Sequence, residues 1–211
     1  MPTYPLAGLF DLCGIADATF WPLSRQELSR TAKGATQAKD LGSALWRASF
    51  TTAPQLINDA AALEAALISL NGSVGSFLAH DPRRPFPRAY PAGDFADTGT
   101  IHTLYPAEAY KIKLEGLPDS FQLSPGDYLG FQYGTRPTRA LHMVVEPVTA
   151  FSSGVTPKFE IFPALRPGAL VGAAVTLKRA PCEMILEPNQ APPVGREMLA
   201  SSVTFSAVQL I

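Results

Sequence analysis

The chain has 211 residues, of which 46% are hydrophobic and 17% are charged. This length and apolar content suffice for the core of one generous domain or two small ones. The 17 basic residues nearly balance the 18 acidic ones, which argues against a strongly basic nucleic-acid binder and against attraction to an anionic membrane. No window reaches the roughly 18 consecutive apolar residues of a membrane span, so we expect no membrane insertion.

Strand patterns occur along the whole chain. Period-two alternation is clear in segment 44–52, where Trp46, Ala48 and Phe50 face one way. In the last segment, Phe205 and Val208 fall on opposite faces, so we expect both faces to be covered. The 20 prolines are spread over the sequence, which is typical of many short strands joined by turns. The expected strands are 18–23, 44–52, 75–79, 109–115, 126–133, 141–148, 158–162, 173–178, 182–187 and 202–210.

One amphipathic helix is expected at about 54–71. Its apolar residues recur with a period near 3.6, which lines one face of a helix. Pro54 in the first turn and Gly72 past the end are typical helix boundaries. These apolar positions are Leu56, Ala60, Leu63, Leu67 and Leu70. Ten strands and one long helix predict an α+β fold, mainly β, formed by a single domain over residues 1–211.

Segment 82–100 is expected to be a loop or arm. It contains four prolines and two glycines, which favour irregular structure over a helix or an inner strand. A connection of this length usually has a function or is disordered. Its arginines and aromatic residues are types enriched at protein interfaces, and the last strand is a second candidate because unpaired strand edges bind other chains. The resulting candidate interface residues are Arg83, Arg84, Phe86, Arg88, Tyr90 and Phe205.

Motifs for catalysis are missing from the sequence. It contains no G-x-S-x-G elbow, no glycine-rich phosphate loop, and no paired histidines at metal-ligand spacing among His80, His102 and His142. Cys13 and Cys182 are far apart, so two free thiols are expected, and whether they ever pair stays open. We therefore expect no enzymatic activity, no catalytic residues, no cofactor and no metal.

A hydrolase with two converging carboxylates is the enzymatic alternative. The candidate acids are Asp81, Asp94, Asp97 and Asp127. Asp81, Asp94 and Asp127 adjoin proline or glycine and are typical turn residues. Nothing in the sequence selects a pair.

Several motifs, covering roughly residues 44 to 187, resemble minor tail proteins of long-tailed, siphovirus-like bacteriophages. They are ALWRASF from Ala44, LEAALISL from Leu63, GSFLAHDPRRP from Gly75, LSPGDYL from Leu123, LHMVV from Leu141 and EIFPALR from Glu160. The chain resembles the distal tail, baseplate and tail-tip proteins of this group. The resemblance implies a β-sandwich or barrel of the tail-tube type with a flanking helix.

The same resemblance implies a non-enzymatic structural protein of the virion tail tip, assembled in the host cytoplasm. It implies a homo-oligomeric ring, of six subunits, that connects the tail tube to the hub or baseplate. The implied partners are the tail tube protein, the hub or baseplate protein and the tape-measure protein, with DNA only passing through the lumen. Rings of one chain are built from heterologous contacts between different patches on neighbouring subunits.

A carbohydrate-binding β-sandwich module acting in host adsorption is the alternative function. Such a module presents exposed aromatic rings to sugars, whereas Trp21 and Trp46 both lie in strand patterns typical of a core. Many distal tail proteins carry a second, carbohydrate-binding-like domain, but one domain accounts for this whole chain. The sequence therefore favours the structural role.

Overall fold

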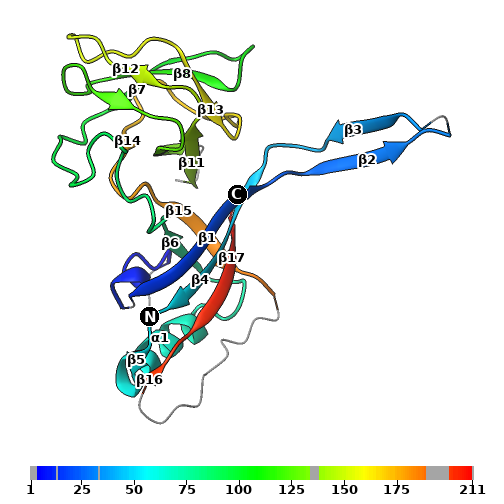
Figure 1. Ribbon diagram of the computed structural model, residues 1–211, viewed down its shortest axis with the longest axis vertical. Coiled ribbons are helices and arrows are strands. Elements are labelled where there is room, and N and C mark those ends of the chain that lie inside the picture. The colour runs from blue at the N-terminus through cyan, green and yellow to red at the C-terminus, as the bar shows by residue number, and fades with distance from the viewer. Residues whose placement is uncertain (1–3, 13, 33, 134–137, 189–199, 211) are drawn as a thin grey trace.

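The computed structural model describes residues 4–12, 14–32, 34–133, 138–188 and 200–210. This part of the chain is mainly β, with one α-helix, α1 (Ile57–Ser69), and a short 3-10 helix, η1 (Leu9–Leu12), which confirms the predicted class (Figure 1). The strands are β1 (Ile15–Leu23), β2 (Gln26–Arg30), β3 (Thr36–Asp40), β4 (Leu45–Thr52), β5 (Gln55–Leu56), β6 (Ser76–Ala79), β7 (Thr100–Leu104), β8 (Lys111–Glu115), β9 (Gln122–Leu123), β10 (Tyr128–Tyr133), β11 (Thr138–Val144), β12 (Val148–Thr149), β13 (Phe159–Phe162), β14 (Val175–Thr176), β15 (Cys182–Leu186), β16 (Ala200–Ser201) and β17 (Thr204–Gln209).

A five-stranded antiparallel sheet with the order β1-β4-β17-β15-β6 forms the lower part of the molecule, with α1 and η1 beside it (Figure 1). The alternation predicted for β4 is confirmed, because Trp46, Ala48 and Phe50 are buried while the residues between them are only half-buried. Their side chains pack with residues of α1, such as Leu63 and Leu67, in one hydrophobic cluster. The helix therefore contributes to the core on the apolar face of this sheet, and residues from the barrel side complete it.

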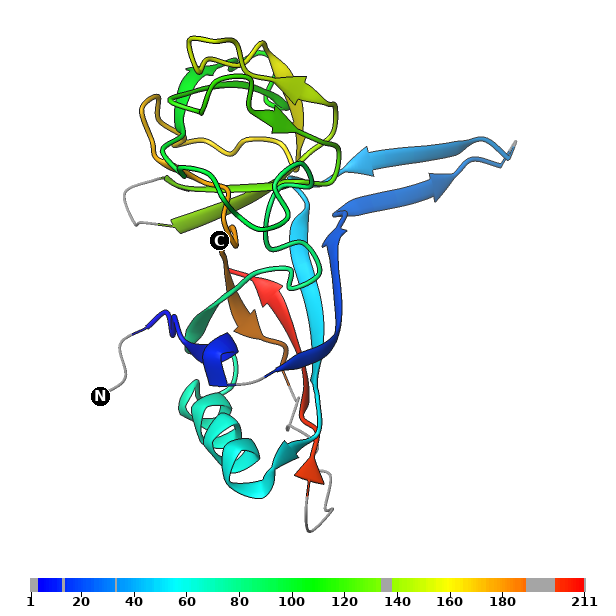
Figure 2. The same cartoon turned by 60° about the vertical axis from the view of Figure 1, so that its left-hand side comes forward.

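A six-stranded sheet with the order β14-β10-β11-β13-β8-β7 forms the upper part, and Figure 2 shows it curled into a nearly closed barrel. Its two edge strands meet through a bridge between Thr100 and Ala174 and a hydrogen bond from Val175 N to Gly99 O of 2.8 Å. The barrel interior holds a second hydrophobic cluster, with Ile112, Leu114 and other residues of these strands. The single domain expected over 1–211 thus contains two clusters of buried residues.

In the sequence, the barrel is inserted between two strands that are neighbours in the lower sheet. The chain passes from β6 into the barrel and returns from the barrel to β15, and these two strands pair with each other in the register Cys182↔Ala79. Tyr128, Leu141 and Ala180 come from the barrel side of the chain but belong to the lower cluster. The two parts therefore share packed side chains where they meet.

Helix α1 begins three residues later than predicted and ends two residues earlier. Pro54 precedes the short strand β5, and Leu56, expected on the buried helix face, is 69% exposed at the end of β5. Leu56 also occupies the N-cap position without any side-chain cap. The prediction was wrong at this end because β5 pairs with β16, which takes residues 55–56 out of the helix. Ala60, Leu63, Leu67 and Leu70 are buried as predicted.

All ten predicted strand segments overlap a strand of the structure. The loop predicted over 82–100 contains neither strand nor helix over 82–99, but Thr100 is the first residue of β7, because it pairs with Glu115 of β8. Six strands lie outside the predictions, namely β2, β3, β5, β7, β9 and β16. The most prominent addition is the β2–β3 hairpin, which projects far from both the sheet and the barrel (Figures 1 and 2).

Candidate functional site

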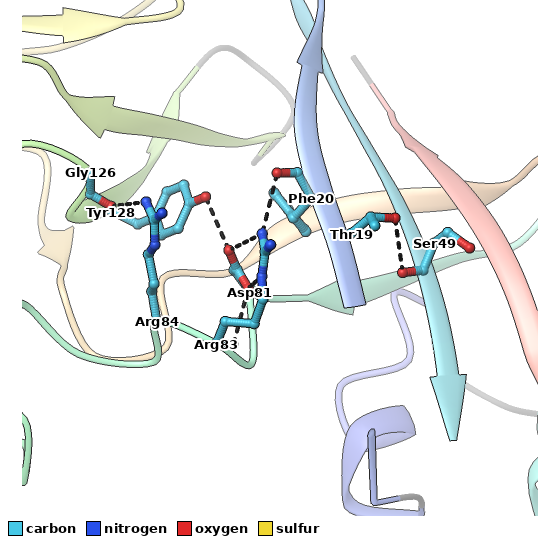
Figure 3. Close-up of polar contacts among 8 residues, drawn as sticks. All are labelled: Thr19, Phe20, Ser49, Asp81, Arg83, Arg84, Gly126 and Tyr128. Atoms are coloured by element: carbon cyan, nitrogen blue, oxygen red, sulfur yellow. Dashed lines mark hydrogen bonds and ion pairs between the residues drawn. The ribbon is translucent and has the colours of Figure 1, made fainter. Parts of the chain in front are cut away.

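The carboxylate of Asp81 lies where the lower sheet meets the barrel (Figure 3). It is buried, with 2% of the residue exposed, and its oxygens accept hydrogen bonds from Arg83 Nε and Nη2, both at 2.9 Å, and from Tyr128 Oη at 3.2 Å. Arg83 also reaches the carbonyl of Phe20 on β1, at 3.5 Å. Burial, together with the nearby Asp81 charge, raises the pKa of the Tyr128 phenol, which keeps it a hydrogen-bond donor.

Two of the other candidate acids accept hydrogen bonds from loop backbone. Asp127 accepts hydrogen bonds from Arg88 N at 2.9 Å and Ser124 N at 2.7 Å, and burial raises its pKa. Asp97 accepts bonds from Leu177 N at 2.9 Å and Lys178 N at 3.2 Å. Asp94 lies exposed on the surface. The structure therefore gives three of the four acids of the hydrolase alternative a structural role in holding the 81–99 segment.

A pocket of about 530 Å³ opens beside this segment. We call it the arginine pocket, and it is lined by Arg83, Arg84, Pro85, Phe86, Pro87, Arg88, Pro91, Pro125, Gly126 and Asp127. Arg84 lies against Gly126, donating from Nη1 to its carbonyl at 3.2 Å, as Figure 3 shows. Gly126 has φ +94°, a backbone conformation that favours glycine, and a Cβ there would come within 2.7 Å of Arg84 Nη1 and displace the guanidinium. Four of the predicted interface residues thus share one hollow.

The other two predicted interface residues pack against aromatic rings of the protein. Phe205 is only 2% exposed, with its ring centroid 5.4 Å from that of Phe50 and 6.1 Å from that of Phe77. Its burial removes this side chain from the expected interface. Tyr90 is half-buried and stacks on Phe121 at 4.4 Å with an interplanar angle of 7°, so it anchors the loop to the barrel.

The β2–β3 hairpin is a second candidate surface, because it does not pack against the rest of the described fold. All residues of both strands are exposed, and neither strand contributes to a described hydrophobic cluster. Leu28 is 70% exposed and lies opposite Ala38, while Glu27 lies opposite Lys39. A turn closes the hairpin, with Thr31 N bonded to Ala35 O at 2.9 Å.

The two tryptophans differ, contrary to the expectation that both are core residues. Trp46 is 1% exposed, but Trp21 is 38% exposed. Trp21 lies on β1 opposite Arg47 of β4, whose guanidinium sits 5.8 Å from the indole centroid. Arg47 also pairs with Glu187 at 2.5 Å. The strand pattern was misleading because Phe20 and Trp21 are neighbours on β1 and point to opposite faces, and only Phe20 joins the core.

Within the described residues, no group of three or more His, Cys, Asp or Glu side chains could hold a metal ion. Cys182 is a buried free thiol, and burial raises its pKa; Cys13 lies outside the described residues. His142 is buried, with Nδ1 at 2.7 Å from the Pro163 carbonyl, while His102 is exposed. No described helix combines the length and apolarity needed to cross a membrane.

Comparison with known proteins adds no relative. No protein-family model matches the chain, and no curated protein matches it. The two surfaces described above therefore carry the functional argument together with the motifs of the sequence.

Proposed function

We propose that this protein is a non-enzymatic structural component of a bacteriophage tail tip. It forms a ring, of six subunits, that connects the tail tube protein to the hub or baseplate protein, with the tape-measure protein as a further contact and DNA passing through the lumen. It is assembled in the host cytoplasm and ends at the tail tip of the virion. The motif resemblance supports the setting, and the β2–β3 hairpin supports the ring.

The hairpin is the observation that carries this proposal. A two-stranded hairpin exposed on both faces is marginally stable alone in water. β2 and β3 pair only with each other among the described strands, so each has an outer edge of unpaired backbone groups. An edge of this kind adds readily to the sheet of another chain. A projecting arm of one subunit that fits a different patch on its neighbour makes a heterologous contact, and such contacts form a ring when the rotation between neighbours closes.

The mass of the protein in solution tests the proposal. Size exclusion with light scattering, and negative-stain images of the same fraction, should give a closed ring with a central hole. Replacing residues 26–40 with a short Gly-Ser turn should give a folded monomer, because the arm is lost and the sheet is kept. A wild-type monomer at every concentration would contradict self-assembly into a ring.

A matched pair of substitutions controls for general loss of surface hydrophobicity. Leu28→Glu changes the hairpin, and Leu170→Glu changes a similarly exposed leucine after the barrel strand β13. We expect Leu28→Glu to weaken the ring and Leu170→Glu to leave its mass unchanged. Equal effects of the two substitutions would argue against the hairpin as the arm.

The exposure of Trp21 favours a second candidate, a carbohydrate-binding module for host adsorption. Exposed indole rings stack on sugars, but Arg47 already lies over one face of this ring. A glycan array with wild type and Trp21→Ala separates the two proposals. Tryptophan-dependent glycan binding by a monomer would favour the module.

A further inference from the structure

We propose that the arginine pocket binds an acidic, extended segment of a partner protein through its carboxylate groups. The pocket combines three features. Its backbone is fixed by hydrogen bonds, two arginine side chains are available for a ligand, and its walls are apolar. Each of these features is independent of the hairpin. The inference goes beyond ring formation and does not rest on it.

The frame of the pocket is fixed by hydrogen bonds to the loop backbone. Arg84 N donates to Asp81 O at 3.1 Å, Arg88 N donates to the Asp127 carboxylate at 2.9 Å, and Arg179 N donates to Pro85 O at 2.6 Å. Prolines further restrict the backbone between these bonds. A preorganised loop loses little conformational entropy when a ligand binds, so weak polar contacts suffice for affinity.

The charges of the pocket favour an anionic ligand. Arg83 is committed to Asp81, and the Asp127 oxygens accept the backbone bonds from Arg88 and Ser124. The Arg84 guanidinium donates a hydrogen bond only to the Gly126 carbonyl among the described residues, and the Arg88 guanidinium makes no hydrogen bond or ion pair with another described residue. The Asp127 carboxylate feels the charge of both arginines but hydrogen-bonds neither guanidinium. Both side chains are exposed. A guanidinium binds a carboxylate with two parallel hydrogen bonds, so the pair can hold adjacent acidic side chains.

The walls favour a peptide over nucleic acid. Phe86 and the surrounding prolines offer apolar surface to an extended backbone, whereas DNA binding needs many cationic contacts along the phosphates. The whole chain has a net charge of −1, so no overall positive charge adds to the attraction of DNA. The hairpin of another copy does not fit as the ligand, because segment 26–40 has three basic and two acidic residues.

Fluorescence anisotropy with a labelled Glu-Pro repeat peptide tests the inference. The neutral Gln-Pro repeat is the control for charge, and labelled duplex DNA is the control for the class of ligand. We expect the full chain to bind the Glu-Pro peptide and neither control. The double variant Arg84→Gln, Arg88→Gln should weaken binding at least about tenfold, since charged hydrogen bonds are lost.

Arg139→Gln is the matched control variant, at the opposite end of the β10–β11 hairpin from Gly126. It should bind the Glu-Pro peptide like wild type, and melting curves should show that all variants fold. Should the double variant unfold, Arg88→Gln alone decides, because the Arg88 guanidinium makes no hydrogen bond or ion pair with a described residue. Absent binding, equal binding by the double variant, or preferential arginine-dependent binding of DNA would each overturn the proposal.

The hairpin deletion separates this inference from the proposed function. Without residues 26–40 the ring should be lost while affinity for the Glu-Pro peptide is kept. A ring whose arginine pocket binds no acidic peptide would leave the structural role intact and reject this inference. A monomeric protein that binds the Glu-Pro peptide would support this inference and reject the ring.

Discussion

The indole Nε1 of Trp46 donates a hydrogen bond of 2.7 Å to the carbonyl oxygen of Leu141, across 95 residues of sequence. Trp46 belongs to β4 of the lower sheet, and Leu141 belongs to β11 of the barrel. The same indole packs edge-on against Tyr128, with ring centroids 5.6 Å apart. One buried side chain therefore joins the two parts of the molecule by both a polar and an apolar contact.

Replacing this tryptophan should destabilise the whole chain. Trp46→Phe removes the hydrogen bond, leaves the buried Leu141 carbonyl without this donor and creates a cavity, which costs about 2 to 3 kcal/mol. Urea unfolding followed by circular dichroism measures this free energy. Trp21→Phe is the matched control, and its cost should stay below about 1 kcal/mol because Trp21 is half exposed. Equal losses would contradict the role of Trp46 at the junction.

Asp81→Asn tests the polar contact at the same junction. The substitution removes the charge that holds Arg83 and weakens the bond from Tyr128, so we expect a loss of about 2 to 3 kcal/mol. The free energy of unfolding is again the measurement. Asp94→Asn, on the exposed part of the same loop, should change it by less than about 0.5 kcal/mol. An unchanged free energy of unfolding in Asp81→Asn would show that the ion pair contributes no net stability.

His142 should make stability fall in mild acid. Burial lowers its pKa from the ordinary value of 6.5 to about 4, so the unfolded chain takes up this proton first. The stability that the folded chain gains from keeping His142 neutral is fully present above pH 6.5, and it is lost as the pH falls toward 4. From neutral pH to pH 5 the expected loss is about 2 kcal/mol.

The measurement is urea unfolding of wild type and His142→Asn at both pH values. The asparagine amide can still donate to the Pro163 carbonyl but does not titrate, so the variant should lose less stability on acidification. His102→Asn, at an exposed position, should retain the wild-type pH dependence. Identical slopes for wild type and His142→Asn would refute the assignment.

Two glycines of similar backbone conformation separate strain from steric overlap. Gly154 has φ +75°, and a Cβ there would collide with the Leu117 carbonyl oxygen, whereas Gly172 has φ +81° and open space around it. Gly172→Ala should cost only the strain of about 1 to 2 kcal/mol. Gly154→Ala should cost more, at least about 3 kcal/mol, because the loop must also shift. Comparison of their melting temperatures checks the difference, and equal values would contradict it.

Strands with one buried face were predictable because burial imposes a period of two on their sequence. β4 shows this rule, since Trp46, Ala48 and Phe50 alternate with residues facing away from the core. The irregular 82–99 segment was predictable because its prolines exclude regular pairing. Both predictions rest on local physical constraints that the sequence carries directly.

The hairpin could not be found in this way, because neither of its faces is buried in the described fold. Its strands, QELSR and TQAKD, lack apolar alternation, and only Gly34 beside the turn hints at the reversal.

Only part of the arginine pocket could be predicted. The arginine-rich composition marked the loop, but the placement of Asp127 against Arg88 depends on residues 39 positions apart. Phe205 was misplaced because an edge cannot be told from a central strand by sequence alone.

The pairing of Ala79 with Cys182 has a consequence for how such a gene could change. Everything between these two residues leaves the lower sheet and returns to it at one point, so a short turn could close β6 directly onto β15. The barrel segment could then be inserted, exchanged or deleted as one unit, and the strand order of the lower sheet would stay the same. Recombination at these two codons would therefore alter the pocket-bearing half of the protein and leave the half with the projecting hairpin in register.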